Sequence, residues 1–353
     1  MDERKKLNQI KPLLLSWYRK HKRSLPWRDD PSPYHVWISE IMLQQTRIEA
    51  VIPYYKRFLE ELPDVASLAA ADDDKLMKLW EGLGYYSRAR NLKRAAIEMM
   101  ERHGGRLPES AEELRKLPGI GDYTAGAVAS ISFGKPEPAV DGNVLRVIMR
   151  YLGKTDDIAL QTTKKETAAA LREIYPEGED AKSLTQAIME LGESVCIPNG
   201  EPKCALCPLA EICRAKKEGL TDTIPVKSPK KPRKQEKKTV FLLTCRGKYA
   251  VRKRPATGLL AKLWEFPNVT GDLAEEEALA HLRACGLSPI SITPSGDAVH
   301  IFTHIEWHMT GYTAECAVPT EDLVWESAEE ILARYAIPSA FRAYTDYMKK
   351  LIE

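Results

Sequence analysis

Two carboxylate residues lie in sequence contexts that could give them different protonation states. Glu40 belongs to the segment VWISEIMLQQT, residues 36–46, which is mostly apolar and has helical spacing. Burial in such a segment would raise the pKa of Glu40 and keep it protonated near neutral pH, as a general acid requires. The alternative is an exposed glutamate on a polar stripe with Gln44 and Arg47, and the sequence favours neither arrangement.

Asp141 is the second carboxylate, and it is followed by a glycine and an asparagine in the segment VDGNV. Taken alone, this pattern favours a turn, or a cap on a helix that begins near Val144. Taken with Glu40, Asp141 could form a pair of catalytic carboxylates. Cleavage of a glycosidic bond needs one protonated acid for the leaving group and one ionised carboxylate for the oxocarbenium-like sugar.

Four of the seven cysteines are clustered with the spacing C-x7-C-x2-C-x5-C. Intracellular proteins rarely form disulfides, so a tight cluster indicates a metal site. Zinc sites of four cysteines commonly contain two C-x2-C pairs, and only one occurs here. Four thiolates suit an iron–sulfur cluster as well as zinc. Because the second C-x2-C pair is missing, we rank zinc below an iron–sulfur cluster as the occupant of this site. The four residues are Cys196, Cys204, Cys207 and Cys213.

The segment LPGIGD, residues 117–122, joins two stretches of helical pattern. Pro118 ends the first stretch, and Gly119 and Gly121 permit a tight turn and a close approach of a ligand to the backbone. Asp122 can cap the following helix. Exposed N–H groups at such a turn and helix start can hold a phosphate oxygen, although a plain helix–helix turn explains the pattern as well.

The elements that must position these residues change in type along the chain. Up to about residue 215, apolar residues recur at helical spacing. Residues 227–238 then hold seven Lys or Arg and two prolines, without a large apolar residue. They predict a linker, which acts as a solvated tether or also contacts phosphates. We therefore expect an all-α domain over 1–218, a basic linker over 219–238 and a second domain over 239–353.

Beyond the linker the apolar spacing shortens towards two, which is typical of strands. Residues 240–252 predict a hairpin, and the alternation over 299–309 predicts a strand with one buried face. Helical patterns over 274–284 and 326–350 make this domain α+β.

The composition limits the classes of protein to consider. The chain has 353 residues, of which 44% are hydrophobic and 29% charged, and its net charge is +2. These values are ordinary for a globular protein, and the net charge alone does not indicate a protein that binds nucleic acids. No apolar run approaches the roughly 20 residues that span a membrane, and no apolar signal core follows the charged N-terminus. We expect a cytoplasmic protein, associated with the nucleoid if the source is bacterial.

These motifs together resemble a known group of proteins. The turn LPGIG, followed by VDGNV and a loop of four cysteines, resembles the endonuclease III superfamily of DNA glycosylases. The segments LPWR (25–28), SEIMLQQT (39–46) and WEGLGYYSRARNL (80–92), with the domain after the linker, are similar to the MutY family of adenine DNA glycosylases. This resemblance covers nearly the whole chain. It implies an all-α helix-hairpin-helix domain with an iron–sulfur loop, followed by an α+β Nudix-like domain.

The resemblance also implies a reaction. The substrate would be adenine mispaired with 8-oxoguanine, or with guanine, in double-stranded DNA, bound by a monomer. Glu40 matches the general acid that protonates adenine N7 and later activates water. Asp141 matches the residue that stabilises the oxocarbenium, and Tyr123 and Asn143 match its positioning neighbours. Bifunctional relatives carry a Schiff-base lysine at the position of Tyr123, so the resemblance implies a monofunctional glycosylase.

Further residues match family positions that bind the substrate. Arg28 and Gln186 match residues of the adenine pocket. Gln45 and Tyr85 match residues inserted into the duplex beside the lesion, where they offset the cost of flipping a base out. A core aromatic residue is the alternative for Tyr85. Gly119 and Gly121 match the hairpin that contacts the DNA backbone.

The cysteine loop matches the ligands of a [4Fe–4S] cluster that braces a DNA-binding loop. The gap between Cys196 and Cys204 holds seven residues, whereas the family usually has six. A turn at Asn199-Gly200 could absorb the extra residue. Lys203 and Arg214 lie near the loop and could meet phosphates, although solvated charges are the simpler expectation.

The C-terminal domain resembles a Nudix fold without the metal site of a Nudix hydrolase. Its start, residues 258–267, matches the family, but the expected carboxylate positions hold Ala280, Arg283 and Ala284. These side chains supply no oxygen ligands for a hard cation, so the resemblance implies binding rather than hydrolysis.

A short segment of this domain matches the family's recognition loop for 8-oxoguanine. That loop reads Phe-Ser-His in the family and Phe302-Thr303-His304 here. Threonine keeps the hydroxyl but adds a methyl group. A loop at 302–304 would interrupt the strand expected over 299–309.

Three other functions remain to be weighed. Tyr123 and the Nudix-like domain disfavour a pyrimidine-specific glycosylase/lyase. Glu40 and Asp141 disfavour a lesion sensor without enzymatic activity. The missing carboxylates disfavour a nucleotide pyrophosphohydrolase.

Overall fold

The chain divides into two compact units in the computed structural model, which describes residues 2–229 and 232–351. The first unit comprises Met1–Ala71 and Arg90–Pro229, and the second comprises Asp72–Ala89 and Lys230–Glu353. A segment from the helical half of the sequence thus belongs to the same unit as the C-terminal domain.

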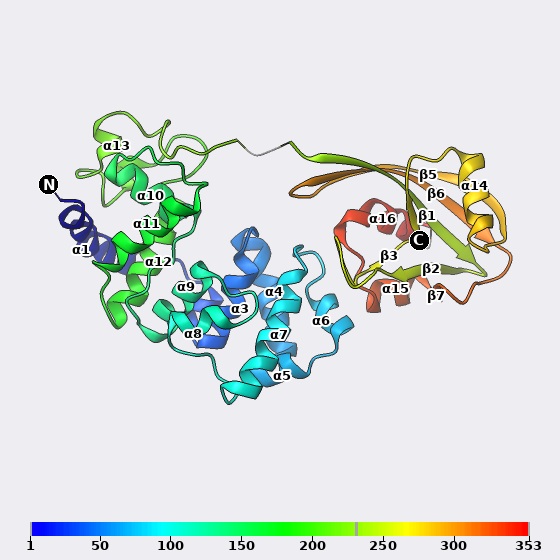
Figure 1. Ribbon diagram of the computed structural model, residues 1–353, viewed down its shortest axis with the longest axis horizontal. Coiled ribbons are helices and arrows are strands. Elements are labelled where there is room, and N and C mark those ends of the chain that lie inside the picture. Colours follow the sequence, from blue (N-terminus) through cyan, green and yellow to red (C-terminus); the bar gives the residue numbers. More distant parts are fainter. Residues whose placement is uncertain (1, 230–231, 352–353) are drawn as a thin grey trace. The chain divides into compact units, whose positions relative to one another are not determined.

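The chain is helical up to Lys217, as its periodicity predicts (Figure 1). No helix within residues 2–229 and 232–351 is long and apolar enough to cross a membrane. The helices are α1 (Glu3–His21), α2 (Pro26–Asp29), α3 (Pro33–Leu43), α4 (Ile48–Glu61), α5 (Val65–Ala70), α6 (Asp73–Leu79), α7 (Ser87–Arg102), α8 (Ala111–Lys116), α9 (Asp122–Phe133), α10 (Gly142–Leu152), α11 (Gln161–Arg172), α12 (Glu179–Ser194), the 3₁₀ turn η1 (Cys204–Leu206) and α13 (Arg214–Lys217).

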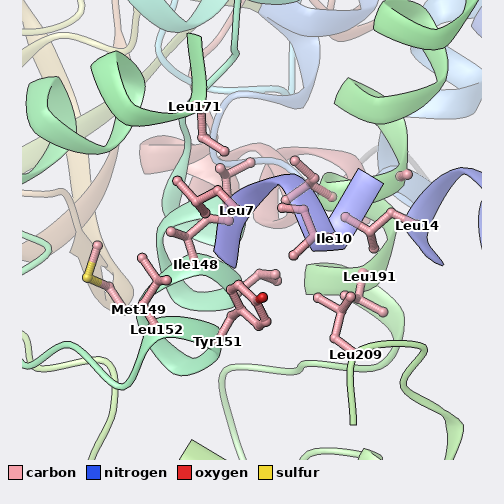
Figure 2. Packing of buried hydrophobic residues seen from close by; sticks show 14 of the residues in the cluster. Leu7, Ile10, Leu14, Ile148, Met149, Tyr151, Leu152, Leu171, Leu191 and Leu209 are labelled. Carbon is pink, nitrogen blue, oxygen red and sulfur yellow. The ribbon is translucent and has the colours of Figure 1, made fainter. Parts of the chain in front are cut away.

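One core of the first unit forms where α1 packs against α10 and α12 (Figure 2). Leu7, Ile10 and Leu14 share one face of α1 because they are three and four residues apart. They are fully buried with Ile148 of α10 and Leu191 of α12. Burial of each such side chain contributes about 1.5–3 kcal/mol, which fixes the helices that carry the polar residues described below.

Helix α3 is buried on almost every side. Ser32 caps it by accepting a hydrogen bond from the backbone N–H of His35, and Pro33 occupies its first position. The helix packs against α4 and α9, and every residue from Val36 to Met42 is buried. Glu40 lies within this stretch, so the buried arrangement is the correct one of the two that the sequence left open.

The second unit contains a mixed sheet of the order β3-β2-β1-β6-β5, in which β4 also pairs with β1 and β7 with β2. Strands β1 and β6 are parallel, and the remaining pairs are antiparallel. The strands are β1 (Lys234–Cys245), β2 (Lys248–Lys253), β3 (Trp264–Glu265), β4 (Asn268–Thr270), β5 (Pro289–Ile301), β6 (Ile305–Cys316) and β7 (Val324–Glu326).

Helices cover both faces of this sheet. Val240 and Leu242 of β1 pack with α15 (Ala328–Arg334) and α16 (Arg342–Lys350), whereas Phe241 and Leu243 pack with α14 (Glu275–Ala284). Successive residues point to opposite faces because the side-chain period of a strand is two. The α+β prediction and the hairpin over 240–252 are confirmed, and so is the helix over 274–284.

Two elements of the second unit were predicted as continuous, and the structure interrupts each of them. The strand expected over 299–309 is two strands, β5 and β6, joined by a turn at 302–304 that the backbone N–H of Phe302 closes by donating to the carbonyl of Ile305. The helix expected over 326–350 is divided into α15, the 3₁₀ turn η2 (Ser339–Phe341) and α16. Pro338 precedes η2, and the residue before a proline disfavours helix.

The segment expected as linker differs as well. Its last residues, 234–238, form the start of β1 and pair with β6. The strand tolerates their charge because lysine stems cover apolar surface: Lys238 is buried, with its ammonium 4.7 Å from the centre of the Trp307 ring. At the other end, Ser228 donates backbone and side-chain hydrogen bonds to Asp157. Lys230 and Lys231 lie outside the described residues.

Candidate active site

Glu40 is held in a buried, hydrogen-bonded position. Its side chain comes from α3 and accepts a 2.6 Å hydrogen bond at Oε2 from the hydroxyl of Tyr123, at the start of α9. Burial raises the pKa of Glu40 to about 7, an effect that the Tyr123 hydrogen bond opposes and that the charge of Asp141 reinforces. Burial also raises the pKa of Tyr123, which therefore stays a hydrogen-bond donor.

Asp141 combines the cap predicted for it with a place beside Glu40. It is the N-cap of α10 and accepts hydrogen bonds from the backbone N–H of Val144 (2.8 Å) and from Nδ2 of Asn143 (2.9 Å). Burial raises the pKa of Asp141, whereas the hydrogen bonds from Val144 and Asn143 and the charge of Arg146 favour its ionised form. Its carboxylate is thus fixed in orientation by α10.

The two carboxylates line the same two hollows. One is a cavity of about 130 Å³ whose wall includes Arg28 and Gln186 as well as Glu40, Asp141, Tyr123 and Asn143. The other is an open cleft of about 630 Å³ that extends past Gln45 and Gly121 to α11. The first unit therefore brings together all the residues that sequence reasoning assigned to the catalytic centre and the adenine pocket.

A buried ion pair beside this cavity was not predicted. Glu190 of α12 is 2% exposed and accepts hydrogen bonds from Arg23 and, at 2.7 Å, from Nη2 of Arg28. Arg28 is further fixed by the carbonyl of Arg23 at 3.0 Å and lies over the ring of Tyr18. One signal was available: Glu190 follows Gln186 by four residues, so both lie on one face of α12.

The turn between α8 and α9 has glycines for two different reasons. Gly119 has φ +78°, and a Cβ there would lie 2.6 Å from Cβ of Asn91. Gly121 has φ −93° with open space where a Cβ would be, so the fold itself does not require a glycine there. The capping prediction for Asp122 is wrong. Gly121 is the N-cap of α9, no side chain caps that helix, and Asp122 pairs with Arg115 at 2.8 Å.

The four clustered cysteines line one cavity of about 30 Å³. Much of its wall is apolar, with Val147, Leu191 and Leu209 among its residues. Arg150 enters it, donating from Nη1 to Sγ of Cys196 at 3.4 Å. Within the described part of the chain, no three His, Cys, Asp or Glu side chains are close enough together to hold one metal ion.

Arg146, which is buried, connects the cysteine loop to the catalytic centre. It donates to the carbonyls of Cys196 (2.6 Å) and Gly192 (2.6 Å) and to Oδ1 of Asn143 (2.8 Å). Arg214, by contrast, turns towards Glu218 at 2.6 Å, as expected of a solvated charge.

The remaining predicted residues lie in the second unit. Tyr85, which follows α6, shares a 2.7 Å hydrogen bond with the hydroxyl of Thr303. Phe302 packs on Trp307 at 4.9 Å between ring centres, while Thr303 and His304 are exposed at the tip of the β5–β6 turn.

The two predicted wedges share a feature of the backbone. Gln45 has φ +60° and Tyr85 has φ +45°, a region that side chains other than glycine rarely occupy. Tyr85 is also 46% exposed, so the alternative of a core aromatic residue is wrong. Residues held in such conformations cluster at ligand-binding sites.

Two family models match the chain. Residues 38–177 match the HhH-GPD superfamily of base excision DNA repair proteins, and residues 239–347 match the NUDIX domain.

Comparison with characterised proteins is consistent with both matches. The adenine DNA glycosylase of Mus musculus is 34% identical over 95% of this chain and 77% of its own length. The human adenine DNA glycosylase is 33% identical over 94% and 73%. The enzyme of Buchnera aphidicola from Acyrthosiphon pisum is 33% identical over 84% of each chain.

Solved structures resemble the helical part. A thermostable thymine-DNA glycosylase matches 61% of this chain and 98% of its own, with a TM-score of 0.55 and 28% identity. A non-covalent complex of endonuclease III with DNA matches the same shares, with a TM-score of 0.51 and 27% identity.

Proposed function

Since this chain belongs to the adenine DNA glycosylase family and is thus a glycosylase of base excision repair, we propose that Glu40 and Asp141 break the bond between adenine and deoxyribose. One observation carries this proposal: Glu40 is buried, bonded to Tyr123, and lines the same cavity as Asp141. The carboxyl group with a pKa of about 7 is the acid, and the capped carboxylate is the anion.

The reaction follows from these roles. Glu40 transfers its proton to N7 of adenine as the C1′–N9 bond breaks and its electron pair enters the base. Asp141 stabilises the positive charge that develops on the sugar. Water then adds to C1′ and returns a proton to Glu40. Because Tyr123 donates to Oε2, the proton of Glu40 resides on Oε1.

Tyr123 also limits the outcome of the reaction. A phenol cannot form an imine with the opened sugar, so the product is an abasic site in an unbroken strand. We propose a monofunctional hydrolase for this reason.

The flipped adenine is recognised in the cavity that Glu40 lines. Arg28 and Gln186 present a guanidinium and an amide to it, and Glu190 fixes the guanidinium in place. A base leaves the duplex at a cost of a few kcal/mol, and these contacts offset part of that cost.

We further propose that the exposed tip of the β5–β6 turn recognises 8-oxoguanine opposite the adenine. Phe302 offers a ring for stacking, and Thr303 and His304 offer hydrogen-bonding groups. Gln45 and Tyr85 enter the duplex at the lesion, as their strained backbone positions suggest. The enzyme acts as a monomer on a duplex with adenine opposite 8-oxoguanine or guanine.

A [4Fe–4S] cluster is the proposed occupant of the cysteine cavity. The four thiols line one cavity. Their spacing holds one C-x2-C pair, whereas zinc sites of four cysteines commonly hold two. Arg150 supplies a charge-assisted hydrogen bond to a sulfur, which suits a negatively charged cluster. When bound, the cluster braces residues 196–213 and leaves the chemistry to Glu40 and Asp141.

Single-turnover excision tests the proposed function. We expect a labelled duplex with adenine opposite 8-oxoguanine to be cut only after treatment with alkali. Strand scission without alkali, or trapping of the enzyme on DNA by borohydride, would contradict the monofunctional mechanism. Release of an oxidised pyrimidine, with adenine left in place, would contradict the substrate.

The dependence of the excision rate on pH should be bell-shaped. Glu40 must be protonated, so the rate constant is expected to fall as the pH rises through about 7. Asp141 must be ionised, so the rate also falls on the acidic side. Tyr123→Phe removes a hydrogen bond that favours ionised Glu40, and it should move the alkaline limb to higher pH. An unmoved limb would mean that another group is the acid.

The cleft beside Gly121 predicts phosphate contacts at α11. Lys164 and Lys165 line it together with the uncapped start of α9. If each lysine meets one phosphate, the double variant Lys164→Ala/Lys165→Ala lowers the slope of log binding constant against log salt by about 1.8. Lys5→Ala/Lys56→Ala removes the same charge outside the cleft and should leave the slope unchanged. Equal slopes in all three proteins would exclude the contact.

A further inference from the structure

Helix α6 and the loop that follows it are fastened to the C-terminal domain by a set of polar contacts. The segment Asp72–Ala89 belongs to the same compact unit as residues 230–353, although 140 residues, Arg90–Pro229, separate them in sequence. Tyr85, which we propose as a wedge in the duplex, lies in this segment. Its attachment to the C-terminal domain therefore bears on how the lesion is read.

Asp74 forms one end of this attachment. Its carboxylate accepts hydrogen bonds from Nζ of Lys253 at 2.8 and 2.9 Å and from Nε1 of Trp264 at 3.3 Å. Trp264 packs against the edge of the Tyr335 ring, with 4.6 Å between the ring centres. The Lys253 ammonium lies over the face of Trp264, 5.4 Å from the ring centre. One carboxylate thus joins α6 to strands β2 and β3.

Glu81 forms the other end. Its Oε1 accepts a 2.8 Å hydrogen bond from the backbone N–H of Ile337, in the bend between α15 and η2. Its Oε2 pairs with Lys78 at 2.5 Å, and Lys78 in turn donates to the carbonyl of Tyr335 at 3.2 Å. These groups satisfy a backbone donor and a backbone acceptor that the break between α15 and α16 leaves without helical partners.

The attachment lies on the same stretch of chain as the contact between Tyr85 and Thr303. Only three residues separate Glu81 from Tyr85, and the hydroxyl of Tyr85 is 2.7 Å from that of Thr303. Arg88 closes the intervening loop by donating to the carbonyls of Leu83 and Gly84, at 2.9 and 3.2 Å. A displacement of α6 from the C-terminal domain would therefore separate Tyr85 from Thr303.

We propose that Asp74 and Glu81 are positioning residues for lesion discrimination: they clamp α6 to the C-terminal domain so that Tyr85 and Thr303 act as one reading unit. This inference rests on the proposed function, because discrimination means faster excision of adenine opposite 8-oxoguanine than opposite guanine. Neither carboxylate lines the cavity of Glu40, so the chemical step itself does not use them.

The test compares excision from the two duplexes at subsaturating enzyme. The double variant Asp74→Ala/Glu81→Ala should lower the ratio of the two rates about tenfold, the effect of losing charge-assisted hydrogen bonds, and should leave excision opposite guanine within twofold. Glu321→Gln/Asp322→Asn removes two exposed carboxylates elsewhere in the C-terminal domain and should keep the ratio. An unchanged ratio in the alanine variant, with the wild type active, overturns the clamp.

Two further measurements separate the clamp from a folding defect and from the proposed function. Asp74→Lys and Lys253→Asp should each lower the ratio, and the exchanged pair in one chain should restore it. Hydrogen exchange needs no activity: the Ile337 amide should exchange faster in Glu81→Ala, and less so in Glu81→Gln, whose amide oxygen still accepts. Equal exchange of that amide in Glu81→Ala and wild type overturns the clamp, whereas a wild type that releases no adenine overturns the proposed function instead.

Discussion

Glu40→Gln is expected to slow adenine excision roughly 10³-fold while the affinity for the mismatched duplex stays within a few-fold. The amide has nearly the size of the carboxyl group and still accepts the hydrogen bond from Tyr123, so α3 and the cavity keep their shape. It cannot deliver a proton to the leaving base. The loss should thus appear in the single-turnover rate constant and not in binding, which separates a transition-state role from a structural one.

The matched control is Glu60→Gln, which makes the same substitution at an exposed position of α4. It should excise adenine at the wild-type rate. Wild-type excision by Glu40→Gln would refute the mechanism, and lost DNA binding would mean that Glu40 has a structural role.

Cys207→Ala is expected to remove the iron and to lower the free energy of unfolding by about 4 kcal/mol or more. The cysteine cavity lies between α10, α12 and the loop over 196–213, and its apolar wall packs with the core of α1. Without a cluster, the residues that line the cavity have nothing to pack against. Arg150 is then left buried near Cys196 without a compensating charge. Iron and sulfide content, thermal unfolding and DNA affinity measure these losses.

Cys285→Ala is the control, because Cys285 is exposed on the C-terminal unit and distant in sequence from the cluster. Its iron content and stability should equal those of the wild type. If Cys207→Ala kept four irons per chain, the assignment of this cysteine as a ligand would be wrong. If zinc were found in the wild type instead, the cluster itself would be excluded.

The sequence predicted which residues meet at the candidate site better than it predicted their surroundings. Asp141 was expected as a helix cap, and the structure has it capping α10. Whether Glu40 is buried cannot be predicted from its segment, since the apolar neighbours favour burial and a stripe with Gln44 and Arg47 favours exposure. Its burial depends on α4 and α9, which pack around α3 from distant parts of the chain.

Glu190 and Arg23 show the same limit. They are 167 residues apart, and the spacing of Glu190 and Gln186 places Glu190 on the face of α12 that lines the cavity without indicating its partner. The start of β1 was missed for a related reason: Lys234–Lys238 read as a solvated linker because their partner strand begins at Ile305. Pairing with β6 and the ring of Trp307 supply the stabilisation that their composition lacks.

The turn at 302–304 was missed by periodicity and found by resemblance. Alternation of apolar and polar residues continues from β5 into β6, so the pattern alone describes one strand. The motif Phe302-Thr303-His304 required a loop at this position, and the backbone hydrogen bond between Phe302 and Ile305 closes one.

The attachment of α6 has a consequence for synthesis on the ribosome. Asp74 leaves the ribosome 179 residues before Lys253, its partner. At 5–20 residues per second, this interval lasts roughly 10–40 s. Throughout that time α6 lacks the residues that later bind it, while the remaining helices around Glu40, up to α12, are translated. The residues of the candidate active site can therefore fold before Lys253 and Thr303, the partners of Asp74 and Tyr85, are translated.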